Sequence, residues 1–77
     1  MTRLPRITGE QLIKALIKDG FEIARQKGSH VQLRKFVEGV KVTFPVPVHK
    51  GKTLKTGTFK GILRKADLAV ERLGEIL

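Results

Sequence analysis

The chain has 77 residues, of which 40% are apolar, and it contains no cysteine. A chain of this length supports one small core, and its apolar content is too high for a disordered basic tail. The lack of cysteine excludes disulfides, thiolate nucleophiles and zinc–sulfur sites. We therefore expect a single domain over residues 1–77, with an N-terminal arm at 1–7 and an extra helical tail at 69–77.

The net charge of +9 is concentrated in the middle of the chain. Between Arg25 and Lys65 there are eleven Lys or Arg and one acidic residue, a balance of +10, while the remaining residues have a balance of −1. Such a local excess attracts polyanions, so nucleic acid is the favoured partner over general solubility. No apolar run has the length of a signal peptide or a membrane span, which predicts a cytoplasmic protein without membrane contact.

The first predicted helix extends over about Gly9 to Asp19. Thr8 and Gln11 have the spacing of a capping box, in which each side chain bonds the backbone amide of the other residue. Gly20 is of the type that ends a helix. Four apolar residues recur at helical spacing and form one stripe: Leu12, Ile13, Leu16 and Ile17.

Three short runs then alternate between apolar and polar side chains, which is typical of half-buried strands. They cover Phe21–Arg25, His30–Arg34 and Val40–Phe44, with turns at Lys27–Ser29 and Glu38–Gly39 between them. Pro45 and Pro47 are expected to end the third strand. Because the connections are short, the strands are expected to form an antiparallel meander with one covered face.

A loop from His49 to Gly57 leads to a second helix, for which Thr56 or Thr58 is the expected cap. The buried stripe of this helix is expected to consist of four residues: Phe59, Ile62, Leu63 and Ala66. The predicted fold class is therefore α+β, in the order α-β-β-β-α, with both helices on one face of a three-stranded antiparallel sheet.

His30 is the first candidate for chemistry. Strand alternation places it on the solvent face with Gln32 and Arg34, opposite the face of the apolar residues. Histidine can both take up and release a proton near neutral pH. Cleavage of RNA needs a base for the 2′-hydroxyl, an acid for the leaving 5′-oxygen and cations for the developing charge. From the spacing alone, an exposed hairpin histidine without a chemical role is favoured.

The loop after the third strand holds weaker candidates. His49 is either a second acid/base or an ordinary loop residue, and the loop interpretation is favoured. A metal site made of the two histidines is not expected, because no carboxylates stand beside them at ligand spacing. Gly51–Thr53 reads GKT, but Val46 stands where a nucleotide-binding P-loop needs glycine, which excludes ATP or GTP hydrolysis. Three lysines and the amides at the helix start form either a phosphate cradle or a solvated loop: Lys50, Lys52 and Lys55.

Two segments together resemble HicA-type toxins, also called the YcfA-like group: GFEIARQKGSHVQL at Gly20–Leu33 and FPVPVHKGKTLKTGTFKGILRKADL at Phe44–Leu68. The resemblance implies a fold like that of the double-stranded RNA-binding domain and an endoribonuclease that cleaves messenger RNA and halts growth. It also implies a HicB-type antitoxin that covers the active site. The histidine of the GSH motif carries over onto His30.

With this resemblance, the expected function is that of a metal-independent ribonuclease without cofactor, monomeric when free, in which His30 transfers the proton. Gly28 and Ser29 would position the phosphate. Flanking phosphates would contact five cationic residues: Lys27, Arg34, Lys50, Lys52 and Lys55. The competing interpretations are a non-catalytic double-stranded RNA-binding module and a regulator that acts on its own operator with its partner.

Overall fold

A computed structural model describes residues 4–77 of the chain. The elements follow in the order α1 (Gly9–Lys18), β1 (Glu22–Lys27), β2 (His30–Val37), β3 (Val40–Pro47), α2 (Thr56–Lys65) and α3 (Val70–Ile76). The predicted α-β-β-β-α order is confirmed, and the C-terminal tail forms the additional helix α3. Residues 1–3 of the expected N-terminal arm lie outside the described residues, whereas Ile7 of the arm is buried in the core.

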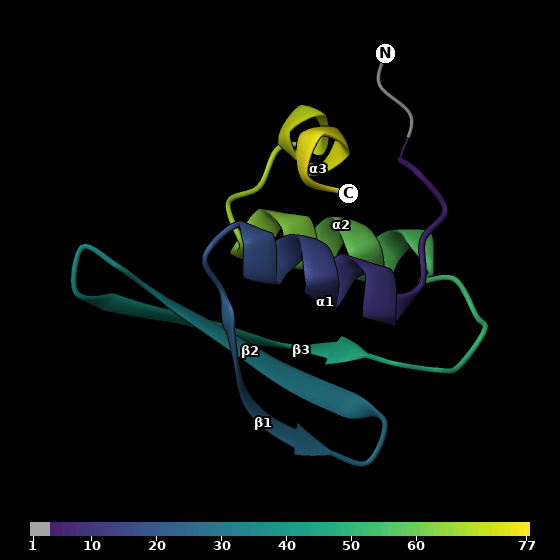
Figure 1. Ribbon diagram of the computed structural model, residues 1–77, viewed down its shortest axis with the longest axis horizontal. Coiled ribbons are helices and arrows are strands. Elements are labelled where there is room, and N and C mark those ends of the chain that lie inside the picture. Colours follow the sequence, from purple (N-terminus) through teal and green to yellow (C-terminus); the bar gives the residue numbers. More distant parts are fainter. Residues whose placement is uncertain (1–3) are drawn as a thin grey trace.

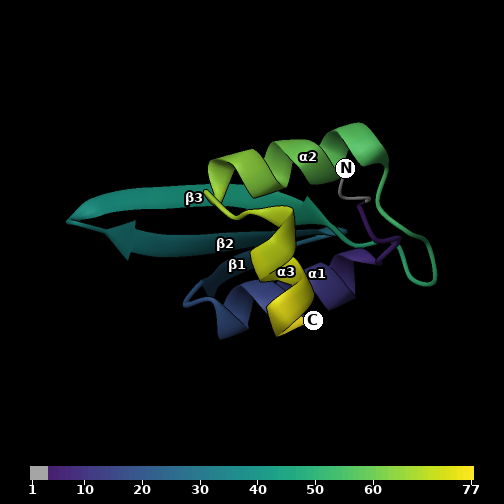
Figure 2. The ribbon, with the colours of Figure 1, turned by 90° about the horizontal axis from the view of Figure 1, so that it is seen from above.

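The three strands form one antiparallel sheet in the order β1-β2-β3. As predicted, α1 and α2 lie side by side on one face of this sheet (Figure 1). Helix α3 lies over these two helices, on the side away from the sheet (Figure 2). The opposite face of the sheet therefore stays open, and the hairpin of β2 and β3 extends beyond the helices.

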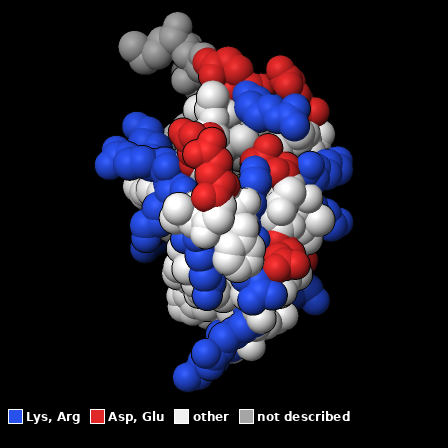
Figure 3. Space-filling model, turned by 90° about the vertical axis from the view of Figure 1, so that its left-hand side faces the viewer, with Lys and Arg blue, Asp and Glu red and all other residues white. Residues whose placement is uncertain are grey.

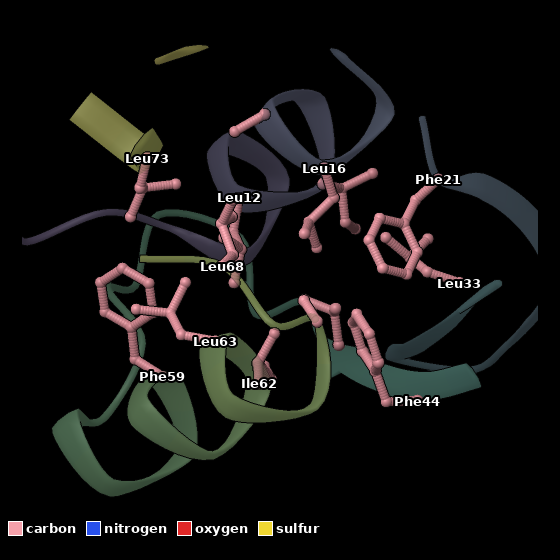
Figure 4. Packing of buried hydrophobic residues seen from close by; sticks show 14 of the residues in the cluster. Leu12, Leu16, Phe21, Leu33, Phe44, Phe59, Ile62, Leu63, Leu68 and Leu73 are labelled. Carbon is pink, nitrogen blue, oxygen red and sulfur yellow. The ribbon is translucent and has the colours of Figure 1, made fainter. Parts of the chain in front are cut away.

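The core fills the space between α1, α2 and the covered face of the sheet (Figure 4). Its largest fully buried side chains come from all layers: Leu12, Leu16, Leu33, Phe44, Val46 and Leu73. Among residues 4–77, no polar or charged side chain is buried. Because α3 contributes Leu73, the C-terminal tail is part of the core.

The capping box at the start of α1 is present as predicted. The Thr8 hydroxyl accepts from the amide of Gln11 at 3.2 Å, and the Thr8 amide donates to Oε1 of Gln11 at 2.9 Å. Helix α1 ends at Lys18, with Asp19 as its C-cap. This box fixes where α1 begins, and α1 in turn covers the end of β3.

Several expected boundaries were wrong, and β1 and β2 reach Lys27 and Val37 instead of ending at Arg25 and Arg34. Strand β3 continues through Pro45 to Pro47 because it is an edge strand. The Val48 amide donates to the Ser29 carbonyl of the neighbouring hairpin, so alternation turns the nitrogens of both prolines to the open edge, where no N–H is needed.

The N-cap of α2 is Lys55, without a side-chain cap bond, and neither Thr56 nor Thr58 has this role. The Leu54 amide donates to the Ile7 carbonyl at 2.8 Å, which holds the chain extended up to this point. The helix therefore begins directly after Lys55, and both threonines lie within its first turn.

Candidate active site

His30 is exposed at the first position of β2, opposite Lys27 on β1 and Pro47 on β3. A two-residue turn of Gly28 and Ser29 joins β1 to β2, and Gly28 has a φ of 59°. A glycine with positive φ at the first central position is typical of the type II′ hairpin turn. This turn makes Lys27 and His30 direct cross-strand neighbours on the open face, as strand alternation predicted for His30.

A first hollow, with a volume of about 890 Å³, lies on the open face of the sheet. We call it the sheet hollow. It is lined by Lys27, Gly28, Ser29, His30 and Arg34, all of which the sequence singled out, and also by Arg25, Gln32, Lys41, Thr43 and Ala24. The Gln32 amide donates to the Thr43 hydroxyl at 2.8 Å, and this hydroxyl donates to the Leu33 carbonyl at 2.8 Å. These two hydrogen bonds hold the polar side chains of Gln32 and Thr43 in the lining of the hollow.

A β-bulge in β1 brings Arg25 into the sheet hollow. Ile23 pairs with Leu33, but Arg25 pairs with Gln32, so Ala24 is an extra residue in β1. Without the bulge, alternation along β1 would put Arg25 on the same face as Ile23. The bulge therefore places Arg25 and Lys27 on the same face as His30.

A second hollow, with a volume of about 740 Å³, lies between the open edge of β3 and α2. We call it the edge hollow. Its charged and titratable lining consists of His30, His49, Lys52, Lys55 and Lys65. His30 lines both hollows, so it stands at their junction. Each hollow falls within the range of about 300–1,000 Å³ that small-molecule sites occupy.

The two hollows are strongly cationic. Four Lys or Arg line the sheet hollow and three line the edge hollow, and no Asp or Glu of the described chain lines either one. Among these cations, Arg34 forms an ion pair, because its Nε lies 2.6 Å from Oε1 of Glu22. Figure 3 shows most acidic side chains toward the top of the molecule, on the side of α3, with basic side chains below and around them. The acidic residues within the described sheet and its turns are Glu22, which pairs with Arg34, and Glu38 in the turn between β2 and β3.

The structure brings together most of the residues that the sequence singled out. Lys52 and Lys55 share the edge hollow with His30, which sequence spacing left undecided. Lys50 is exposed in the same loop and, among the described residues, belongs to neither lining. Sequence reasoning missed three cations, namely Arg25, Lys41 and Lys65. Of these, Lys41 had a usable signal, because it alternates with Val40 and Val42 and so faces away from the core.

Two further features concern metal binding and membrane-spanning helices. Within residues 4–77, no group of three or more His, Asp or Glu side chains could hold a metal ion. No helix in the described part of the chain is long and apolar enough to cross a membrane.

The fold and the site define a small basic α+β domain with an exposed histidine, His30, where two cationic hollows meet. A family model described as HicA toxin of bacterial toxin-antitoxin matches residues 9–68. This match covers most of the chain, which therefore belongs to the HicA toxin family, the toxins of toxin–antitoxin systems with a cognate antitoxin as partner. No curated protein and no solved structure matches the chain.

Proposed function

We propose that the protein is a metal-independent endoribonuclease that cleaves messenger RNA, with His30 as its acid/base. The observation that carries this proposal is the position of His30, exposed at the junction of two cationic hollows whose described linings contain no carboxylate. A phosphodiester strand that crosses this junction brings a ribose and its phosphate to the imidazole. General acid–base catalysis requires such contact, within about 2.6–3.2 Å in a productive complex.

The neighbouring residues have distinct roles in this proposal. Gly28 and Ser29 form the turn beside His30 and position the scissile phosphate. Lys27 and the cations of the sheet hollow bind the strand on one side, whereas Lys52 and Lys55 bind it on the other. Cations held in a preformed site stabilise the charge that develops on phosphorus, without reorganisation at the moment of reaction. Lys50 has no part in this arrangement, because it lines neither hollow.

The cognate antitoxin is, in this proposal, a HicB-type protein that covers the same junction. A surface with seven Lys or Arg side chains and no lining carboxylate favours a partner with acidic side chains. Such a partner would exclude RNA by occupying the two hollows together. The toxin would then be inactive in the complex and active when released.

An incubation with RNA in the presence of EDTA tests the function. One substrate is an RNA oligonucleotide on which any cut is mapped, and the second has a single 2′-deoxyribose at the mapped position. The proposal predicts cleavage of the first and an intact bond at that position in the second, because the 2′-oxygen is the nucleophile. A non-catalytic RNA-binding module would leave both substrates intact, and cleavage of the deoxy position would rule out attack by the 2′-hydroxyl.

A further inference from the structure

The backbone around His49 is held at both ends. Before it, the Val48 amide donates to the Ser29 carbonyl at 2.6 Å, which ties this segment to the turn that carries His30. After it, the Lys52 amide donates to the His49 carbonyl at 2.9 Å and closes a four-residue turn, with Gly51 at a φ of 76° in the third position. His49 is thus fixed relative to His30, although it lies outside the strand.

The two histidines line the same hollow. Pro47 is directly opposite His30, and its side chain therefore shares the open face. The Val48 amide, bonded to the Ser29 carbonyl, continues the contact of this segment with the turn of His30 one residue past Pro47, and His49 follows directly. Both side chains are exposed and both line the edge hollow.

We propose that His49 is a second catalytic residue, the acid that protonates the leaving 5′-oxygen, with His30 as the base. This inference rests on the proposed ribonuclease function and deepens it. His30 lines both hollows and His49 only the edge hollow, so a scissile phosphate at the junction has its departing strand on the His49 side. Lys52 and Lys55 line the same hollow and hold the phosphates of that departing strand.

The step balances without a metal or another reactant. His30 takes the proton of the 2′-hydroxyl, the bond between the 2′-oxygen and phosphorus forms, and the bond between phosphorus and the 5′-oxygen breaks. The 5′-oxygen keeps the electron pair of the broken bond and takes the proton of the His49 imidazolium. The products are a 2′,3′-cyclic phosphate and a 5′-hydroxyl, with His30 protonated and His49 neutral.

A substrate whose leaving 5′-oxygen is replaced by sulfur tests this role directly, because a thiolate leaves without protonation. Single-turnover cleavage in EDTA is measured for wild type, His49→Ala and His30→Ala on the oxygen and sulfur substrates. On the oxygen substrate, His49→Ala should be slower by about 100-fold or more, the usual contribution of a general acid. On the sulfur substrate, His49→Ala should approach the wild-type rate, while His30→Ala stays slow.

The outcomes separate the two proposals. Rescue of His49→Ala by sulfur supports the acid role, and it also excludes misfolding, because a misfolded variant would cut neither substrate. A His49→Ala variant that is slow on both substrates, or as fast as wild type on the oxygen substrate, overturns the inference and leaves the ribonuclease function standing. A wild-type protein that cuts neither substrate overturns the function itself.

Discussion

Gly9, the first residue of α1, lies directly against the backbone carbonyl of Pro47, the last residue of β3. A Cβ atom on Gly9 would overlap that carbonyl oxygen and approach Cα of Val48 to 3.3 Å. This contact sets the end of β3 beneath the start of α1. It also positions the segment that leads from Pro47, opposite His30, to His49.

Gly9→Ala should therefore destabilise the protein, because backbone atoms on both sides must move apart. Overpacking of this kind typically costs about 1–3 kcal/mol in the free energy of unfolding. Chemical denaturation measures the loss. Gly74→Ala in α3 is the matched control, since a Cβ there meets no described atom within 4 Å, and it should stabilise by about 0.4–1 kcal/mol. Equal stability of Gly9→Ala and wild type would contradict the close approach.

The contact of Gly9 with Pro47 illustrates what the sequence does and does not predict. The capping box of Thr8 and the solvent-facing position of His30 follow from local spacing and alternation, and both are present. The place of Lys65 beside Lys52 and Lys55 depends on how closely α2 approaches the edge of β3. That approach is a tertiary relation between segments far apart in sequence, and no local pattern encodes it.

The β-bulge at Ala24 shows the same limit within a single strand. Simple alternation keeps Arg25 on the face of Phe21 and Ile23, and one unpaired residue reverses this. The expected end of β3 at Pro45 and Pro47 is wrong for a related reason, because a proline ends a central strand but is tolerated at an outer edge. The nitrogens of both prolines face the open edge of β3 because of its register with β2. That register is a property of the assembled sheet.

The ion pair of Glu22 with Arg34 leads to a prediction about RNA affinity at the sheet hollow. Both side chains are substantially exposed, at 39% for Arg34 and 59% for Glu22, so the pair contributes at most about 1 kcal/mol to folding. Glu22→Gln frees the guanidinium and should tighten RNA binding. The slope of log affinity against log salt should steepen by about 0.7, which corresponds to one further phosphate contact on a single strand.

RNA affinity across a salt series measures this effect. Glu75→Gln is the control, because it also removes an acidic partner of an arginine, Arg72, but in α3 on the far side of the helix layer from the sheet. The control should leave the slope unchanged. If both variants shift the slope equally, the effect is one of net charge, and Arg34 does not contact phosphate.

The turn between β2 and β3 offers a stabilising substitution. Glu38 and Gly39 have φ angles of 51° and 80°, the positive pair of a type I′ turn, in which asparagine followed by glycine is preferred. Glu38→Asn should raise the free energy of unfolding by about 0.5–1 kcal/mol. Thermal unfolding measures the gain. Glu38→Gln removes the same charge without the left-handed preference of asparagine, and an equal gain from this variant would show that charge, not backbone conformation, is responsible.

The central claim is that the exposed imidazole of His30 performs the proton transfer in metal-free RNA cleavage. It is tested most directly by the single-turnover cleavage rate of wild type and His30→Ala in EDTA, with RNA affinity and thermal unfolding measured on the same samples. Because His30 is exposed and outside the core, His30→Ala should fold and bind RNA like wild type, with cleavage slower by about 100-fold or more. A folded, RNA-binding His30→Ala variant that cuts at the wild-type rate would contradict the account.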